Sequence, residues 1–247
     1  LDGSVTGANN TAVGRSALTN LTTGTKNTAL GQIALEDVTT GADNTAIGSD
    51  ALKQVTTGSN NTAVGVDALA ANTSSGNSAL GHSALAANTS GSGNIGVGKG
   101  ALLVNTTGNY NVAVGQNTLD ANNASQNTAI GHEALSANTT GDQNTAVGAD
   151  SLDANTTGQH NVGVGYRALG ANTTASNNTA VGKDALKSNT DGTANVALGT
   201  AALESNTTAD RNTAIGAYAL DASTTATQNT AVGYNALTAN TTGTYNT

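Results

Sequence analysis

Residues 127–143 read NTAIGHEALSANTTGDQ, and closely related segments fill the whole chain. With the first asparagine counted as position 1, the repeat is NTAVGxxALxxNTTGxx. Fourteen copies begin at Asn10, Asn27, Asn44, Asn61, Asn77, Asn94, Asn111, Asn127, Asn144, Asn161, Asn178, Asn195, Asn212 and Asn229. They span residues 10–245 of the 247, with partial repeats at both ends. Residues 1–247 are therefore predicted to be a single repeat array and a window of a longer protein.

The composition excludes a thick globular core. The chain has no Phe, Trp, Met, Cys or Pro, and only five Tyr. Its apolar residues are mostly Ala, Val, Leu and Ile at fixed positions, which favours a thin interior repeated along the chain. The abundance of Asn, Thr, Ser and Gly would also fit disorder. A disordered tract, however, would not keep Leu at position 9 in every copy.

Positions 2 to 4 are predicted to form a strand. Position 4 is always Val, Ile or Leu, and position 2 is Thr, Ser, Val or Ile, residues that suit a pleated surface. Because side chains alternate along a strand, positions 2 and 4 should share one face. The opposite face carries the small residues, with Ala or Gly at position 3 and Gly at position 5, which permit close approach by another backbone.

Positions 7 to 12 are open to two interpretations, a single helical turn or a second short strand. Position 12 is Leu21, Val38 and Val55 in the first copies and Asn in nearly all later ones. An inward ladder of stacked amides would explain this exchange. The two 16-residue copies, which begin at Asn61 and Asn111, lose a residue after position 12, so a surface loop is expected there.

Charged residues fall almost entirely at the variable positions 6, 7, 10, 11, 16 and 17. This separation from the fixed apolar positions is typical of stacked coils whose variable side chains face water. The chain is therefore predicted to be an all-β β-solenoid, or β-roll, with one 17-residue repeat per coil. Successive coils should be about 4.8 Å apart, the spacing of neighbouring strands.

Two candidate dry faces suggest that several chains lie side by side. One face would fill each coil and the other would form the seam between chains. We expect the seam to be the Ala/Gly face, because positions 3 and 5 almost never accept a side chain larger than Ala. The preferred assembly is a homotrimer.

The NTAVG and NTAIG strands followed by GxxAL resemble the head-domain repeats of trimeric autotransporter adhesins. Still more, they resemble the NTAVG…ALxxNTTG arrays of phage tail-fibre and related surface-fibre proteins. The resemblance covers the whole chain, but the adhesin repeat typically has 14 residues and this one has 17. It implies a trimeric β-roll in an extracellular, cell-surface or virion fibre.

Charge and hydropathy narrow the partners. The net charge of −8 and the absence of Lys/Arg clusters argue against nucleic acid. No apolar run is near 18 residues long, so no membrane insertion is expected within this window. The predicted partner is another copy of the chain, and a host-cell surface or glycan receptor is a further candidate.

No catalytic residue, cofactor or metal site is predicted, and the chain is not expected to be an enzyme. The histidines His82, His132 and His160 occupy variable positions and should be solvated. The acidic position 7 could bring carboxylates of adjacent repeats together, as in Asp50/Asp67 and Glu133/Asp150; Asp184 is at the same position. No calcium loop accompanies them, so solubility charges are the preferred interpretation. Gly96-Val97-Gly98 and Gly163-Val164-Gly165 lack the context of a phosphate loop.

Asn-Thr-Thr triplets match the acceptor motif for N-glycosylation, although an amide ladder with turn threonines is preferred. They begin at Asn105, Asn138, Asn155, Asn172, Asn206 and Asn240. The leading function is a structural fibre, acting as shaft or adhesive head. Two alternatives remain: ice or surface binding through the threonines of positions 13 and 14, and carbohydrate binding by the fibre. Tyr166, Tyr218 and Tyr234 are too sparse in the sequence to predict an aromatic platform for sugars.

Overall fold

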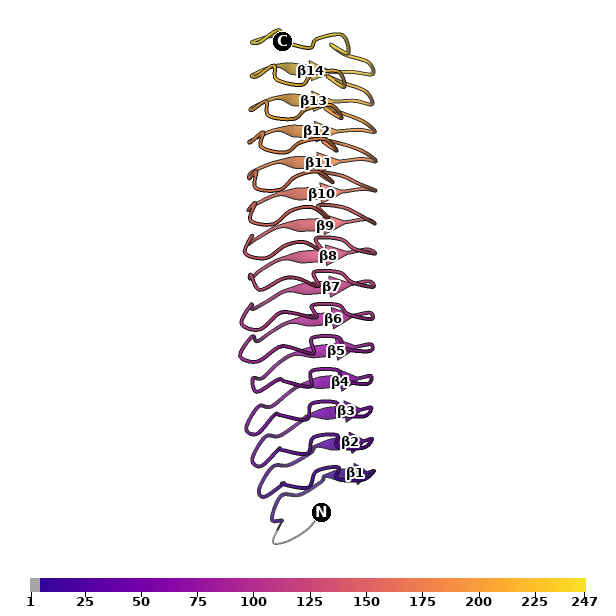
Figure 1. Ribbon diagram of the computed structural model, residues 1–247, viewed down its shortest axis with the longest axis vertical. Helices are drawn as coiled ribbons and strands as arrows, with labels where there is room; N and C mark the ends of the chain where they lie inside the picture. Colours follow the sequence, from indigo (N-terminus) through magenta and orange to yellow (C-terminus); the bar gives the residue numbers. More distant parts are fainter. Residues whose placement is uncertain (1–4) are drawn as a thin grey trace. The chain divides into compact units, whose positions relative to one another are not determined.

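The computed structural model describes residues 5–247, which form two compact units. Unit 1 extends to Ser125, and unit 2 runs from Gln126 to Thr247. Within each unit, every repeat makes one coil that contains one short strand (Figure 1). The predicted all-β solenoid with one 17-residue repeat per coil is therefore confirmed for each unit.

The strands of unit 1 occupy positions 2 to 4 of successive repeats and pair in parallel, each with the next along the chain. They are β1 (Thr11–Val13), β2 (Thr28–Leu30), β3 (Thr45–Ile47), β4 (Thr62–Val64), β5 (Ser78–Leu80), β6 (Ile95–Val97) and β7 (Val112–Val114). The pairing is exactly in phase with the repeat: Thr28 pairs with Thr45, and Ala29 with Ala46.

Unit 2 repeats the same arrangement. Its strands are β8 (Thr128–Ile130), β9 (Thr145–Val147), β10 (Val162–Val164), β11 (Thr179–Val181), β12 (Val196–Leu198), β13 (Thr213–Ile215) and β14 (Thr230–Val232). Because equivalent residues pair, each side chain lies in a column of its counterparts from neighbouring coils. Ala129, for example, pairs with Ala146.

The two faces of the strand are oriented opposite to the expectation from the sequence. Ala129 and Ala146 at position 3 have no exposed surface and lie inside the coil, whereas Ile130 at position 4 is exposed. The expected seam at the Ala/Gly face is therefore wrong, since that face fills the coil. A coil closed by only 17 residues has room for methyl groups opposite its Leu, and the larger Val, Ile and Leu side chains of position 4 must point outward.

The core is built from small and medium side chains. Position 3 and position 8 contribute Ala, and position 9 contributes Leu, which is completely buried in Leu35, Leu135 and Leu203 among others. Asparagines of positions 1 and 12 complete the interior, as at Asn144 and Asn155. The interior is thin and repeated, as the composition predicts.

Positions 7 to 12 form neither a helical turn nor a second strand, so both interpretations of this segment are wrong. Instead the chain makes tight turns with left-handed residues at positions 7 and 9. The position 9 leucines have φ between 51° and 56°, for instance 52° at Leu135. Such a conformation is most unfavourable for β-branched side chains, which explains why no copy has Val or Ile there.

Position 5 requires glycine for two reasons. Its φ lies in a region that disfavours L-residues, as at Gly148 with φ 130°. A Cβ atom added to this residue would also collide with the backbone of Gly165, the equivalent residue of the next coil. The column of glycines thus allows successive coils to stack at this corner.

Inter-coil hydrogen bonds continue beyond the strands. Leu135 N–H donates to the carbonyl of Ser151 at 3.0 Å, and Thr139 N–H donates to the carbonyl of Thr156 at 2.9 Å. The Thr139 hydroxyl donates to the same carbonyl at 3.0 Å. The non-strand segments are therefore held in register with their neighbours although they have no regular secondary structure.

The amide ladder predicted at position 12 is confirmed. Asn172 Nδ2 donates to Asn155 Oδ1 at 2.9 Å, and Asn155 Nδ2 donates to Asn138 Oδ1 at the same distance. A second ladder, which the sequence analysis did not predict, runs along position 1. There the backbone N–H of Asn161 donates to Asn144 Oδ1 at 2.9 Å. The fixed asparagine at position 1 was the available signal for it.

The loop predicted from the two short copies is also confirmed. In 17-residue copies the position 1 amide donates to the position 15 carbonyl, as Asn44 Nδ2 does to Gly58 O at 2.9 Å. In the short copies Ser74 O and Ala124 O accept this bond from Asn61 and Asn111, each at 2.8 Å. The missing residue is therefore position 14, which is solvent-exposed in the other copies.

Candidate functional site

All three histidines are exposed, as predicted from their variable positions. His132 lies beside two of the carboxylates that the sequence placed in adjacent repeats, Glu133 and Asp150. One ligand atom from each of these side chains lies within 4.8 Å of the other two. The pair Glu133/Asp150 is thus brought together by the coil.

The geometry of this cluster favours ion pairing over metal ligation. His132 Nε2 is 3.6 Å from Glu133 Oε1, while the other ring nitrogen, Nδ1, is 4.0 Å from Asp150 Oδ1. The two carboxylates thus face different edges of the ring, whereas a bound metal would need both beside one nitrogen. The imidazole side chain is also 53% exposed. The cluster therefore resembles a surface ion-pair network.

The other acidic residues at position 7 are paired with lysines. Lys53 Nζ is 3.5 Å from Asp50 Oδ1. Asp184 has two such neighbours, with Lys183 Nζ at 3.5 Å from Oδ2 and Lys187 Nζ at 3.8 Å from Oδ1. These contacts agree with their interpretation as surface charges.

The Gly-x-Gly segments are structural elements of the coil. Gly96 and Gly163 occupy position 3 inside the coil, where an added Cβ would come within 3.4 Å of Leu85 and within 3.3 Å of Leu152, respectively. Gly98 and Gly165 are the stacked corner glycines of position 5. Neither segment presents a free loop of backbone N–H groups.

Five of the six asparagines in the N-glycosylation triplets have no exposed surface, and their side chains belong to the position 12 ladder. They are Asn105, Asn138, Asn155, Asn172 and Asn206. Asn240, in the last coil, donates its amide to Gly243 O at 2.9 Å. The amide ladder with turn threonines is therefore the correct interpretation of these triplets in the folded coil.

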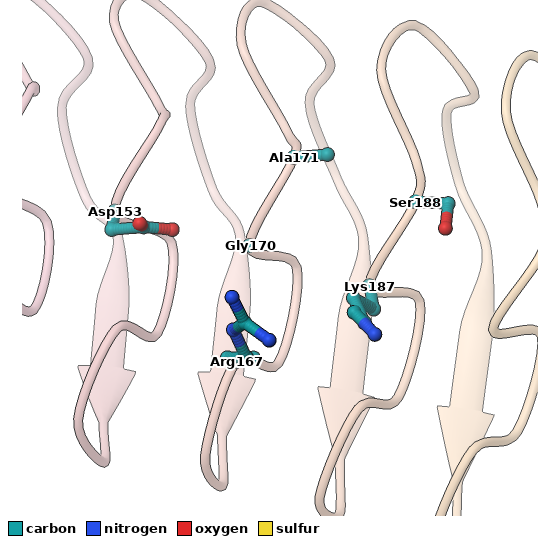
Figure 2. A pocket seen from close by; sticks show the side chains of 6 residues that line it. All are labelled: Asp153, Arg167, Gly170, Ala171, Lys187 and Ser188. Atoms are coloured by element: carbon teal, nitrogen blue, oxygen red, sulfur yellow. The ribbon is translucent and has the colours of Figure 1, made fainter.

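A notch of about 310 Å³ opens on the turn side of unit 2 (Figure 2). Asp153, Gly170 and Lys187 occupy position 10 of three successive coils, and Gly170 leaves a gap between its two neighbours in that column. Arg167, Ala171 and Ser188 complete the lining. Sequence reasoning missed this notch, although a glycine within a column of larger residues was a visible signal.

The electrostatics of the notch are uneven. Burial raises the pKa of the Asp153 carboxyl above its ordinary value of 3.8, and the charge of Asp150 adds to the rise. Backbone hydrogen bonds and the charge of Arg167 act in the opposite direction. Lys187 is engaged by carboxylates, with Nζ 3.3 Å from Glu204 Oε1 and 3.8 Å from Asp184 Oδ1.

Tyrosines lie close together on the same turn side. The rings of Tyr218 and Tyr234, from successive coils, meet edge to face with centroids 6.1 Å apart. The guanidinium of Arg167 lies 5.5 Å from the centroid of the Tyr166 ring. The sequence analysis treated these tyrosines as isolated, because residues 16 apart become neighbours only after the coil has formed.

Comparison with protein-family models, with curated proteins and with solved structures found no match for this chain. Among residues 5–247, no helix is long and apolar enough to cross a membrane.

Proposed function

We propose that the chain is a structural element of an extracellular or virion fibre, in which copies of the chain associate through the outer face of the sheet. This outer face consists of positions 2 and 4 of each strand. The stacked coils would supply length and stiffness, and would hold a binding element at a distance from the surface that carries the fibre.

The observation that carries the proposal is the row of apolar side chains on the outer face. At position 4, Val13 is 56% exposed and Leu80 is 51% exposed in unit 1, and Val232 is 68% exposed in unit 2. Single exposed apolar residues are normal on protein surfaces, but a contiguous apolar strip is typical of an interaction surface. Here the strip continues from strand to strand within each unit.

The composition of the outer face supports the same conclusion. No copy has a charged residue at position 2 or position 4, although positions 6 and 7 accept Lys, Arg, Asp and Glu. A row that only faced water would be expected to accept charges in the same way. The argument that the sequence analysis applied to the Ala/Gly face therefore holds for the Val/Ile/Leu face, which is the one exposed to solvent.

A second copy of the chain is the partner that matches this surface best. The exposed side chains recur once per coil, at about 4.8 Å. Another copy would present apolar side chains with the same period and no opposing charge. Cyclic arrangements of identical chains satisfy every such face in a closed assembly. Three copies are proposed because the strand motif resembles repeats of trimeric fibres.

Cysteine cross-linking tests this proposal, because the wild-type chain contains no cysteine. Val147→Cys on the outer face should form an intermolecular disulfide under mild oxidation. Ala149→Cys, two residues away at the variable position 6, is the matched control and should remain reduced. A Val147→Cys protein that folds but stays uncross-linked would contradict association through this face.

Ice or surface binding is a second candidate, and the structure changes where it would be located. The threonines of position 13 donate their hydroxyls to the neighbouring coil, as Thr156 does to Thr173 O at 3.0 Å. Threonines at position 2, such as Thr145 and Thr179, instead point outward from the sheet. This row belongs to the proposed seam. A monomer with thermal hysteresis would favour ice binding, whereas an oligomer without it would favour the fibre.

A further inference from the structure

The notch around Gly170 has the size of a binding site for one small ligand. Its volume of about 310 Å³ is at the lower end of the roughly 300–1,000 Å³ typical of ligand pockets. It exists because glycine replaces the side chain that most other coils carry at position 10. Leu103 fills the equivalent place in unit 1, which shows that the coil accepts a large residue there.

Arg167 is the cation in the notch that is available to a ligand. Lys187 is engaged by Asp184 and Glu204. Arg167 is exposed, and within the described residues the structure records its guanidinium over the Tyr166 ring without an ion pair. An aromatic ring under a guanidinium limits the orientations of the group. Its planar N–H donors match the two oxygens of a carboxylate.

The remaining groups of the notch suit hydroxyls and a sugar ring. Asp153 points along the coil toward Gly170 (Figure 2), and its carboxyl oxygens can accept hydrogen bonds from adjacent hydroxyls. Ser188 offers one further donor and acceptor, and Ala171 presents a methyl group. The raised pKa of Asp153 reduces the repulsion between its carboxyl and an anionic ligand.

We propose that this notch binds a hexuronic acid unit of a glycan, with the sugar carboxylate on Arg167 and neighbouring hydroxyls on Asp153 and Ser188. The proposal goes beyond a passive shaft, because it gives the coil a ligand. It involves positions 7, 10 and 11 and no residue of the outer face, so it does not depend on the assembly of the fibre.

Saturation-transfer NMR titrations of the full chain with D-glucuronate, D-glucose and acetate test the proposal. D-glucuronate should bind at least tenfold more tightly than either of the others, since only it offers both the carboxylate and the hydroxyls. Acetate binding as tightly would show simple attraction of an anion and overturn the assignment to a sugar. Equal binding of D-glucose would overturn the role of Arg167.

Matched variants locate the binding. Arg167→Gln should weaken D-glucuronate binding at least tenfold, whereas Arg211→Gln, which removes the same charge from an exposed site elsewhere in unit 2, should leave it unchanged. Gly170→Leu should abolish binding by filling the notch. Its melting curve by circular dichroism shows whether the coil has folded. Undiminished binding to a folded Gly170→Leu protein, or equal losses in the two arginine variants, would overturn the proposal.

Discussion

Asn105 donates its side-chain amide to Asn88 Oδ1 of the preceding coil at 2.9 Å and to Gly108 O of its own coil at 3.0 Å. One buried side chain therefore links neighbouring coils and closes the turn of its own coil. The same pair of bonds recurs at Asn155, Asn172 and Asn189 in unit 2. Buried amides can thus replace apolar packing at position 12, provided that each amide finds its partners.

Replacing one member of this ladder should be costly. Asn155→Val would leave Asn138 Oδ1 without its donor and Asn172 Nδ2 without its acceptor. We expect the free energy of unfolding to fall by about 1–3 kcal/mol, the typical effect of unsatisfied buried polar groups. Asn20→Val, at an exposed amide, is the control and should change it by less than about 0.5 kcal/mol. Equal effects in urea titrations would contradict the ladder's role.

The left-handed conformation of position 9 makes a specific prediction for Leu135. Leu135→Val should destabilise the protein by more than the roughly 0.5–1.5 kcal/mol of losing one buried methylene, because valine is β-branched and Leu135 has φ 52°. Leu135→Met keeps an unbranched Cβ and should cost less than about 1.5 kcal/mol. Thermal unfolding of both variants compares them. A Leu135→Val protein as stable as Leu135→Met would show that the backbone conformation does not restrict this position.

Leu135 also tests which residues face inward. Leu135→Asp should cost several kcal/mol, since it buries a carboxylate, whereas Glu133→Ala should change the free energy of unfolding by no more than about 0.5 kcal/mol. Leu135 has no exposed surface, while the Glu133 side chain is 46% exposed. Similar shifts of the melting temperature in these two variants would be inconsistent with the observed interior.

Ile33 is a β-branched residue in a left-handed conformation, with φ 64° at position 7. Other copies have Asn117 and Asn235 at this position, with φ 52° and 55°. Ile33→Asn should therefore raise the melting temperature, because asparagine adopts this conformation at lower cost. Gln32→Asn, at the neighbouring position 6, serves as the control. A lower melting temperature for Ile33→Asn would mean that packing of the isoleucine outweighs its backbone strain.

The raised pKa of Asp153 predicts a pH-dependent gain in stability when the carboxyl is removed. A carboxyl whose pKa is higher in the folded state stabilises the fold below the unfolded pKa of about 3.8, and this contribution is lost as the pH rises through the folded pKa. Asp153→Asn should thus be more stable than wild type near pH 7, with the difference disappearing below pH 3.8. Chemical unfolding at both pH values measures it. A constant difference would contradict the shift.

The fixed period of Leu and Gly was sufficient to predict the solenoid, the loop at position 14 and the ladder at position 12. It did not determine which strand face lies inside, because both faces avoid charge and alternation gives the same pattern in either orientation. The size of the coil decides the matter: Ala129 fits opposite Leu135, and Ile130 does not. The turns were missed because leucine rarely has positive φ, and no local signal in ALxxN announces it. The notch required Asp153, Gly170 and Lys187 to be seen as neighbours.

Sedimentation equilibrium of the wild-type chain and of Val147→Lys measures the central claim most directly. The account predicts that the wild type has three times the mass of one chain. Val147→Lys should sediment as a folded monomer, because the lysine disrupts the outer face but not the core. A wild-type monomer with the circular dichroism of a folded solenoid would contradict association through the outer face, and so would a Val147→Lys protein that retained the wild-type mass.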